Sequence, residues 1–213
     1  MKDLLDYKET LDVNNRNIYN LFEKHKPESG VFIETGCHLG GGLTKAVHCG
    51  FTKLYSCDIN MERVETSIEK VSELARYGSI IEPYIYNCDS RLFLAQVLPL
   101  IEEDALFWLD AHDEGGGVPV LEELTQIRDI FKSKTSTIMI DDIPLYLKQE
   151  GIEELKKIIK EINEDYEFEN LTTNDGGNYV IIASIVDKDG VGHSQVDEKV
   201  NSVCPYCGVG CQI

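Results

Sequence analysis

The chain has 213 residues, of which 42% are hydrophobic and 27% are charged, and these values are ordinary for one soluble globular domain. It carries 38 Asp and Glu against 20 Lys and Arg, which gives a formal charge of -18. This charge argues against nucleic-acid partners and anionic membranes, because binding to both depends largely on Lys and Arg. No apolar run approaches the roughly 20 residues that span a bilayer, and the polar N-terminus does not resemble a signal peptide, so we expect a cytoplasmic protein.

The predicted elements alternate along most of the chain. Residues 1–28 are helical in pattern, and strands are predicted at 31–35, 53–58, 80–87, 105–110, 136–141, 166–171 and 178–186. Helices are predicted between them, at 43–49, 61–77, 90–102, 119–131 and 151–163. Strands joined by helices of this length are typical of crossover units, so we expect an α/β fold with a Rossmann-like, doubly wound and mostly parallel sheet.

The end of the chain departs from this alternation. Leu171 and Asn178 are separated only by Thr-Thr-Asn-Asp-Gly-Gly, a sequence typical of a hairpin, so the last two strands are predicted to be antiparallel. From Asp187 onward the chain is polar and contains glycine, which is typical of a tail. The predicted organisation is a helical segment (1–28), one domain (29–186) and a tail (187–213).

The first predicted strand ends in a glycine-rich loop, with the sequence Glu34-Thr35-Gly36-Cys37-His38-Leu39-Gly40-Gly41-Gly42. An acid at a strand end, glycines that let a ligand approach the backbone and a following helix N-terminus together indicate a nucleotide-type pocket. This loop alone does not separate S-adenosylmethionine from NAD.

Each of the next four predicted strands also ends in a carboxylate. Asp58 lies about 20 residues beyond the loop, where an acid commonly binds the ribose hydroxyls. Asp89 can accept a hydrogen bond from an adenine amino group, and Asp110 and the pair Asp141-Asp142 follow the fourth and fifth strands. Because parallel strands end at one edge of a sheet, we expect these side chains at the same rim.

This arrangement resembles the class I S-adenosylmethionine-dependent methyltransferases over residues 30–186. The loop stands where that family has acid-x-Gly-x-Gly-x-Gly, with His38 in place of the middle glycine, and it is similar to the loop of macrolide-type sugar O-methyltransferases. The final hairpin, which a dinucleotide dehydrogenase would lack, agrees with this resemblance. The resemblance implies that S-adenosylmethionine is bound by Glu34, Thr35, Gly36, Cys37, His38, Gly40, Asp58, Ile59, Asp89, Ser90 and Asp110.

The carboxylates of Asp110, Asp141 and Asp142 form a second predicted site. Unpaired carboxylates at one rim repel each other, and a divalent cation such as Mg²⁺ removes that cost. The pattern is similar to that of metal-dependent O-methyltransferases of the catechol and macrolide-sugar types, which implies that these three residues hold Mg²⁺. His112 is the candidate base, with Asp110 beside it. The alternatives are that Asp110 only lines the cofactor pocket, that Asp142 caps the turn before Pro144, and that His112 binds the glycines of 115–117.

Three cysteines stand at the end of the chain, in the sequence Cys204-Pro205-Tyr206-Cys207-Gly208-Val209-Gly210-Cys211. This spacing resembles the iron–sulfur segment of molybdopterin-type formate dehydrogenases, which has a fourth cysteine further along the chain. A cluster usually needs four thiolates, so we favour no working iron–sulfur cluster in this tail. The alternatives are Zn²⁺ with His193 as the fourth ligand, a fragment of a neighbouring or fused reading frame, and a disordered tail with reactive thiols.

The sequence therefore predicts methyl transfer from S-adenosylmethionine to a hydroxyl of a sugar or another small polar molecule, assisted by a divalent metal. Residues 113–118, with three glycines, are a candidate lid over the site. The alternatives are a non-catalytic S-adenosylmethionine-binding module and an NAD-linked oxidoreductase. A homo-oligomer is compatible with the sequence, whereas nucleic-acid and membrane partners are not expected.

Overall fold

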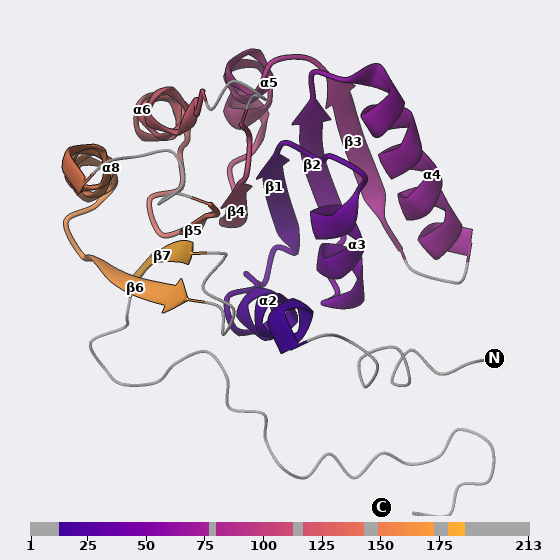
Figure 1. The fold of residues 1–213 in the computed structure, drawn as a ribbon, viewed down its shortest axis with the longest axis horizontal. Coiled ribbons are helices and arrows are strands. Elements are labelled where there is room, and N and C mark those ends of the chain that lie inside the picture. The colour runs from indigo at the N-terminus through magenta and orange to yellow at the C-terminus, as the bar shows by residue number, and fades with distance from the viewer. Residues whose placement is uncertain (1–12, 77–79, 113–116, 143–148, 173–178, 186–213) are drawn as a thin grey trace, which may run out of the picture.

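The computed structural model describes residues 13–76, 80–112, 117–142, 149–172 and 179–185, which form a seven-stranded sheet between two layers of helices (Figure 1). The strand order is β3-β2-β1-β4-β5-β7-β6. The strands are β1 (Val31–Thr35), β2 (Lys53–Asp58), β3 (Glu82–Asn87), β4 (Ala105–Leu109), β5 (Thr137–Ile140), β6 (Tyr166–Thr172) and β7 (Tyr179–Ile185). β1 to β5 pair in parallel, whereas β7 runs antiparallel to both β5 and β6. The predicted α/β fold with a C-terminal antiparallel hairpin is therefore confirmed.

The helices cover the two faces of this sheet. They are α2 (Val13–Lys24), α3 (Gly41–His48), α4 (Met61–Arg76), α5 (Ser90–Val97), the 3₁₀ turn η1 (Leu98–Leu100), α6 (Val120–Ile130) and α8 (Gln149–Ile162). α2, α3 and α4 pack on one face, and α5, α6 and α8 pack on the other (Figure 1). None of the helices in these described ranges is both long and apolar enough to cross a membrane.

The central strands are buried because both faces of the sheet are covered. All five residues of β1 and of β4 are buried, and alternate residues of β1 join opposite cores. Phe22 of α2 packs against Phe32, with ring centroids 5.1 Å apart, and against Trp108, with ring centroids 5.2 Å apart. Burying an aromatic side chain of this size contributes about 1.5–3 kcal/mol, so this contact fixes α2 on the sheet.

Side chains at the carboxyl edge of the sheet begin two of the helices. Oδ1 of Asn60 accepts hydrogen bonds from the backbone N–H groups of Glu62 (2.9 Å) and Arg63 (3.3 Å) at the start of α4. Oδ1 of Asp89 accepts a hydrogen bond from the backbone N–H of Arg91 (2.9 Å) at the start of α5. These caps satisfy N–H groups that a helix leaves unpaired, and they fix both first turns beside the strand ends.

Several predicted elements have somewhat different bounds in the structure. The helix predicted at 90–102 stops at Val97 and continues as η1, because Pro99 lacks the N–H that an α-helix would use. The strand predicted at 80–87 begins at Glu82. The predicted tail (187–213), its cysteines and most of the predicted lid (113–118) lie outside the described residues.

Candidate functional site

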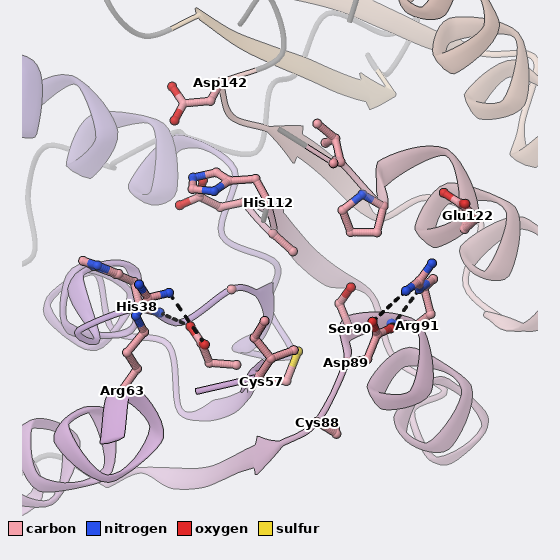
Figure 2. A pocket seen from close by; sticks show the side chains of 18 residues that line it. His38, Cys57, Arg63, Cys88, Asp89, Ser90, Arg91, His112, Glu122 and Asp142 are labelled. Atoms are coloured by element: carbon pink, nitrogen blue, oxygen red, sulfur yellow. Dashed lines mark hydrogen bonds and ion pairs between the residues drawn. The ribbon is translucent and has the colours of Figure 1, made fainter. Parts of the chain in front are cut away.

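A pocket of about 500 Å³ opens at the carboxyl edge of the parallel strands (Figure 2). Its volume lies within the usual range for small-molecule sites. The predicted site residues that line it are Gly36, His38, Asp58, Ile59, Asp89, Ser90, Asp110, His112 and Asp142. Five strand ends therefore contribute to one site, as the sequence predicted.

The glycine loop folds over the end of β2. The backbone N–H of Gly36 donates to the carbonyl oxygen of Cys57 at 3.0 Å, and the N–H of His38 donates to Oδ2 of Asp58 at 2.9 Å. Gly36 has a φ of 81°, and a Cβ at this position would lie 2.8 Å from the carbonyl oxygen of Asp110. This position therefore requires glycine, whereas His38 reaches the left-handed region (φ 45°) with a side chain that lines the pocket.

Other residues of the loop lie behind the pocket wall. Of the predicted cofactor residues, those that do not line the pocket are Glu34, Thr35, Cys37 and Gly40. Glu34 is 2% exposed, and its Oε2 accepts a hydrogen bond from Oγ of Ser56 at 2.7 Å. Burial raises the pKa of Glu34 to about 8. A Cβ on Gly42 would lie only 1.9 Å from Oε1 of Glu34, so this glycine makes room for the buried carboxyl.

Asp58 is held by several donors at the end of β2. Its Oδ2 binds the N–H of His38, its Oδ1 accepts from the N–H of Asn60 at 2.9 Å, and Nη1 of Arg63 lies 4.0 Å from Oδ1. Both oxygens thus have a fixed direction and still have lone pairs for ligand hydroxyls. This geometry suits the ribose role predicted for Asp58.

Asp89 is engaged by its own helix. Besides capping α5, its carboxylate accepts hydrogen bonds from Nε of Arg91 (2.9 Å) and Nη2 of Arg91 (2.7 Å), and the guanidinium holds the pKa of Asp89 below its usual value (Figure 2). Ser90 is next to it, is 6% exposed and lines the pocket. The adenine contact predicted for Asp89 therefore competes with a two-point ion pair.

The opposite side of the pocket holds acids that face one another. Asp110, His112 and Asp142 each offer one ligand atom, and these atoms all lie within 4.8 Å of each other. The pKa of Asp110 is raised well above its usual value by burial and by the charges of Asp141, Glu34 and Asp142. Oδ1 of Asp142 is buried and has no hydrogen-bond partner among the described residues.

Asp141 lies beside this group and not within it. Its Oδ1 accepts a hydrogen bond from the backbone N–H of Asp142 at 2.9 Å. Burial raises the pKa of Asp141 to about 6, although Lys45 of α3 and His112 act in the opposite direction. Consecutive residues of an extended chain point in opposite directions, and Asp142 has a left-handed φ of 55°, so the sequence could not tell which acid joins Asp110.

The donors of Asp110, His112 and Asp142 fit a divalent cation. Two carboxylates and an imidazole are accepted by Mg²⁺, Mn²⁺ and the later first-row metals, and the nitrogen donor favours the transition metals. The buried, unpartnered oxygen of Asp142 is the observation that supports this fit, because an unpaired buried acceptor is costly. All three residues also line the pocket, so a cation here would contact a bound acceptor.

The sequence interpretation missed several residues at this site. Arg63, Arg91 and Glu122 line the pocket, and Val118 and Pro119 form part of its wall. Glu123 is fully buried under the pocket, next to Thr35. One signal could have revealed Glu123, because it occupies a position on the apolar face of α6 together with Val120, Leu124 and Ile127.

Comparison with known proteins shows what this fold is similar to. No family model matches the sequence, and no curated protein matches it. An rRNA methylase from Streptococcus thermophilus has a TM-score of 0.56 at 12% identity, over 84% of this chain and 99% of that chain. The ribosomal protein L11 methylase from Lactobacillus delbrueckii has a TM-score of 0.55 at 14% identity, over 82% and 80%. Magnesium protoporphyrin IX methyltransferase from Synechocystis, with bound S-adenosylmethionine, has a TM-score of 0.53 at 15% identity, over 85% and 81%. At these identities the likeness establishes the class I methyltransferase fold.

Proposed function

We propose that this chain transfers a methyl group from S-adenosylmethionine to a hydroxyl of a sugar or another small polar molecule, with assistance from a divalent metal. The observation that carries this proposal is the arrangement of one pocket between two sets of acids. Asp58 lies on one side, fixed for a ribose, and the Asp110–His112–Asp142 group lies on the other. The fold supports the donor, because the solved structures that share it include methyltransferases with S-adenosylmethionine or its product bound.

The donor would lie across the ends of β1, β2 and β3. Asp58 would accept hydrogen bonds from the two ribose hydroxyls, and Gly36, which lines the pocket without a side chain, would border the methionine part. The exposed side chain of Ile59 offers an apolar surface to the base. The sulfonium methyl would then point toward the acidic side of the pocket, where a negative field stabilises the positive sulfur.

The acidic side would hold the metal and the acceptor. Asp110 and Asp142 would be the carboxylate ligands, and a bound divalent cation would lower the pKa of an acceptor hydroxyl and fix its position. His112 is exposed enough to take the released proton to solvent, and its ring nitrogen is close enough to serve as a ligand instead. Asp141 would act through the backbone N–H of Asp142, which it holds in place.

A small polar acceptor fits the charge of the molecule better than a nucleic acid does. The formal charge is -18, and the two arginines that line the pocket, Arg63 and Arg91, already face Asp58 and Asp89. A polyanionic acceptor would find few uncommitted cations there. A sugar or polyol brings neighbouring hydroxyls, which are oxygen ligands of the kind that Mg²⁺ and Mn²⁺ accept.

Titration calorimetry with S-adenosylhomocysteine tests the donor. We expect micromolar binding by the full chain, and no heat change with NAD at the same concentrations. Absence of binding at millimolar S-adenosylhomocysteine would remove the methyltransferase proposal, and preferential binding of NAD would select the oxidoreductase alternative. Binding of the donor without turnover, on a panel of sugars and polyols, would favour a non-catalytic binding module.

Metal dependence is tested separately once an acceptor is found. We expect turnover to be lost in excess EDTA and restored by Mg²⁺ or Mn²⁺. Asp110→Asn and Asp142→Asn should each reduce kcat by at least about 100-fold, because a ligand is lost. Asp129→Asn, an exposed position of α6, is the matched control and should leave kcat unchanged. Full turnover in EDTA would exclude a required metal and would leave the proposed use of S-adenosylmethionine unaffected.

A further inference from the structure

The first observation is a carboxyl group buried beneath the donor side of the pocket. Glu123 lies on the face of α6 that packs toward the sheet, and its side chain has no exposed surface. Its Oε2 accepts a hydrogen bond from Oγ1 of Thr35, the last residue of β1, at 3.4 Å. Its Oε1 is buried and has no partner with hydrogen-bond geometry among the described residues. A buried acceptor left in this way is costly, and this points to a role beyond packing.

The second observation is that the carboxyl of Glu123 adjoins a residue of the pocket wall. The hydroxyl of Ser90 is near enough to this carboxyl to lower its pKa as a hydrogen-bond donor. Ser90 also lines the pocket (Figure 2). Ser90 stands at the start of α5, directly after Asp89, whose carboxylate is occupied by Arg91. The hydroxyl of Ser90 takes part in no ion pair, so it remains able to bind a nucleotide base in this part of the pocket.

We propose that Glu123 is a positioning residue for S-adenosylmethionine. The charge state of the Glu123 carboxyl sets the direction in which the Ser90 hydroxyl points. A charged Glu123 accepts the hydrogen of Ser90, so Ser90 presents its lone pairs to the pocket. A neutral Glu123 can itself donate to Ser90, which then presents its hydrogen to the pocket. The 6-amino group of adenine is a hydrogen-bond donor, so it matches only the state in which Glu123 is charged and Ser90 presents its lone pairs. This inference rests on the proposed function, because it assigns a regulation to the same donor site.

The charges around Glu123 place this change near neutral pH. Burial raises the pKa of Glu123 to about 7, and the hydroxyls of Ser90 and Thr35 limit the rise. Asp89 and Glu122 add negative charge, whereas Arg91 of α5 acts in the opposite direction, and the Cys57 thiol of β2 faces the same carboxyl. S-adenosylmethionine binds better when Glu123 is charged. Its affinity should therefore rise as pH increases through about 7 and level off above that pH.

Titration calorimetry with S-adenosylhomocysteine between pH 6 and pH 8.5 tests the inference on the full chain. We expect the affinity of the wild-type protein to rise about tenfold, which is the usual effect of one mismatched buried hydrogen bond. Glu123→Gln keeps the shape of the side chain and cannot ionise, so its affinity should be independent of pH in this range. Asp129→Asn replaces an exposed carboxyl of the same helix and should keep the rise.

S-inosylhomocysteine, in which oxygen replaces the 6-amino group, provides a second readout. Its oxygen is an acceptor, so it should bind the wild-type protein more tightly at pH 6 than at pH 8. Ser90→Ala should remove the pH dependence for both ligands, and it tests the inference even if Glu123→Gln does not fold. An equal rise with pH in the wild type and in Glu123→Gln would overturn the inference while leaving the donor assignment standing. A failure of every variant to bind S-adenosylhomocysteine would instead remove the proposed function, and this inference with it.

Discussion

The two sides of the pocket treat their carboxylates differently. On the donor side, Asp58 accepts two backbone hydrogen bonds, and Asp89 accepts two from the guanidinium of Arg91. On the acidic side, Asp110 and Asp142 lie within 4.8 Å of His112, and one oxygen of Asp142 has no partner among the described residues. Burial and neighbouring charges raise the pKa of Asp110, whereas Arg91 lowers that of Asp89.

This difference indicates what each side is built to bind. A carboxylate that backbone donors already hold can add hydrogen bonds to a neutral ligand without reorganising. Carboxylates that repel one another bind a cation with a gain, because the cation removes the repulsion. The donor side is therefore suited to hydroxyl groups, and the acidic side to a positive charge.

The largest effect is expected on the donor side. Asp58→Asn removes the charge that would bind the ribose hydroxyls and should weaken S-adenosylhomocysteine binding about 100-fold, since two hydrogen bonds to a charged group contribute about 3 kcal/mol or more. Asp142→Asn removes a charge on the acidic side and should change this affinity less than about threefold. Titration calorimetry in metal-free buffer measures both. Equal losses in the two variants would contradict a division of the pocket into two sides.

A smaller effect is expected for metal binding. Mn²⁺ binding, followed by electron paramagnetic resonance, should weaken at least about tenfold in Asp142→Asn and change little in Asp58→Asn. In the wild type the affinity should fall as pH is lowered through about 6, because Asp141 then becomes neutral. The raised pKa of Asp110 acts in the same direction. Mn²⁺ affinity that is equal in all three proteins would show that these acids do not form a metal site.

The sequence predicted the architecture well because the physical signals of the fold are local. Strands of four to seven residues, helices between them and the Thr-Thr-Asn-Asp-Gly-Gly turn region determine a parallel sheet with an antiparallel end. The same rule brings every strand end to one edge, so Asp58, Asp110 and Asp142 could be placed at one pocket. Pro99 shows the limit of periodicity, because a single missing N–H ended a helix that the apolar pattern extended.

The partners of the site residues could not be predicted in the same way. Asp89 and Arg91 form a pair because a cap turns the first residues of α5 together. Asp141 lies beside the Asp110–His112–Asp142 group, next to Asp142 with its positive φ. Glu34, a predicted cofactor residue, is buried against Gly42. Each of these outcomes depends on side-chain direction within one or two residues, which hydrophobic periodicity does not encode.

The stability of the protein as a function of pH reports on the buried carboxyl of Glu34, whose charge would raise the pKa of Asp110. Folding raises the pKa of Glu34 from its usual 4.5 to about 8, so the folded state holds the proton more tightly, and stability from this group is full below about 4.5 and is lost as pH rises through about 8. Glu34→Gln mimics the neutral form and should be more stable than the wild type at pH 8.5 by about 4 kcal/mol, with little difference at pH 5. Glu65→Gln, at an exposed position of α4, is the control and should show no such dependence. Urea unfolding in metal-free buffer measures the difference in the free energy of unfolding. A variant that is less stable than the wild type at pH 8.5 would contradict this prediction. It would mean that the charged form of Glu34 stabilises the fold more than its repulsion with Asp110 destabilises it.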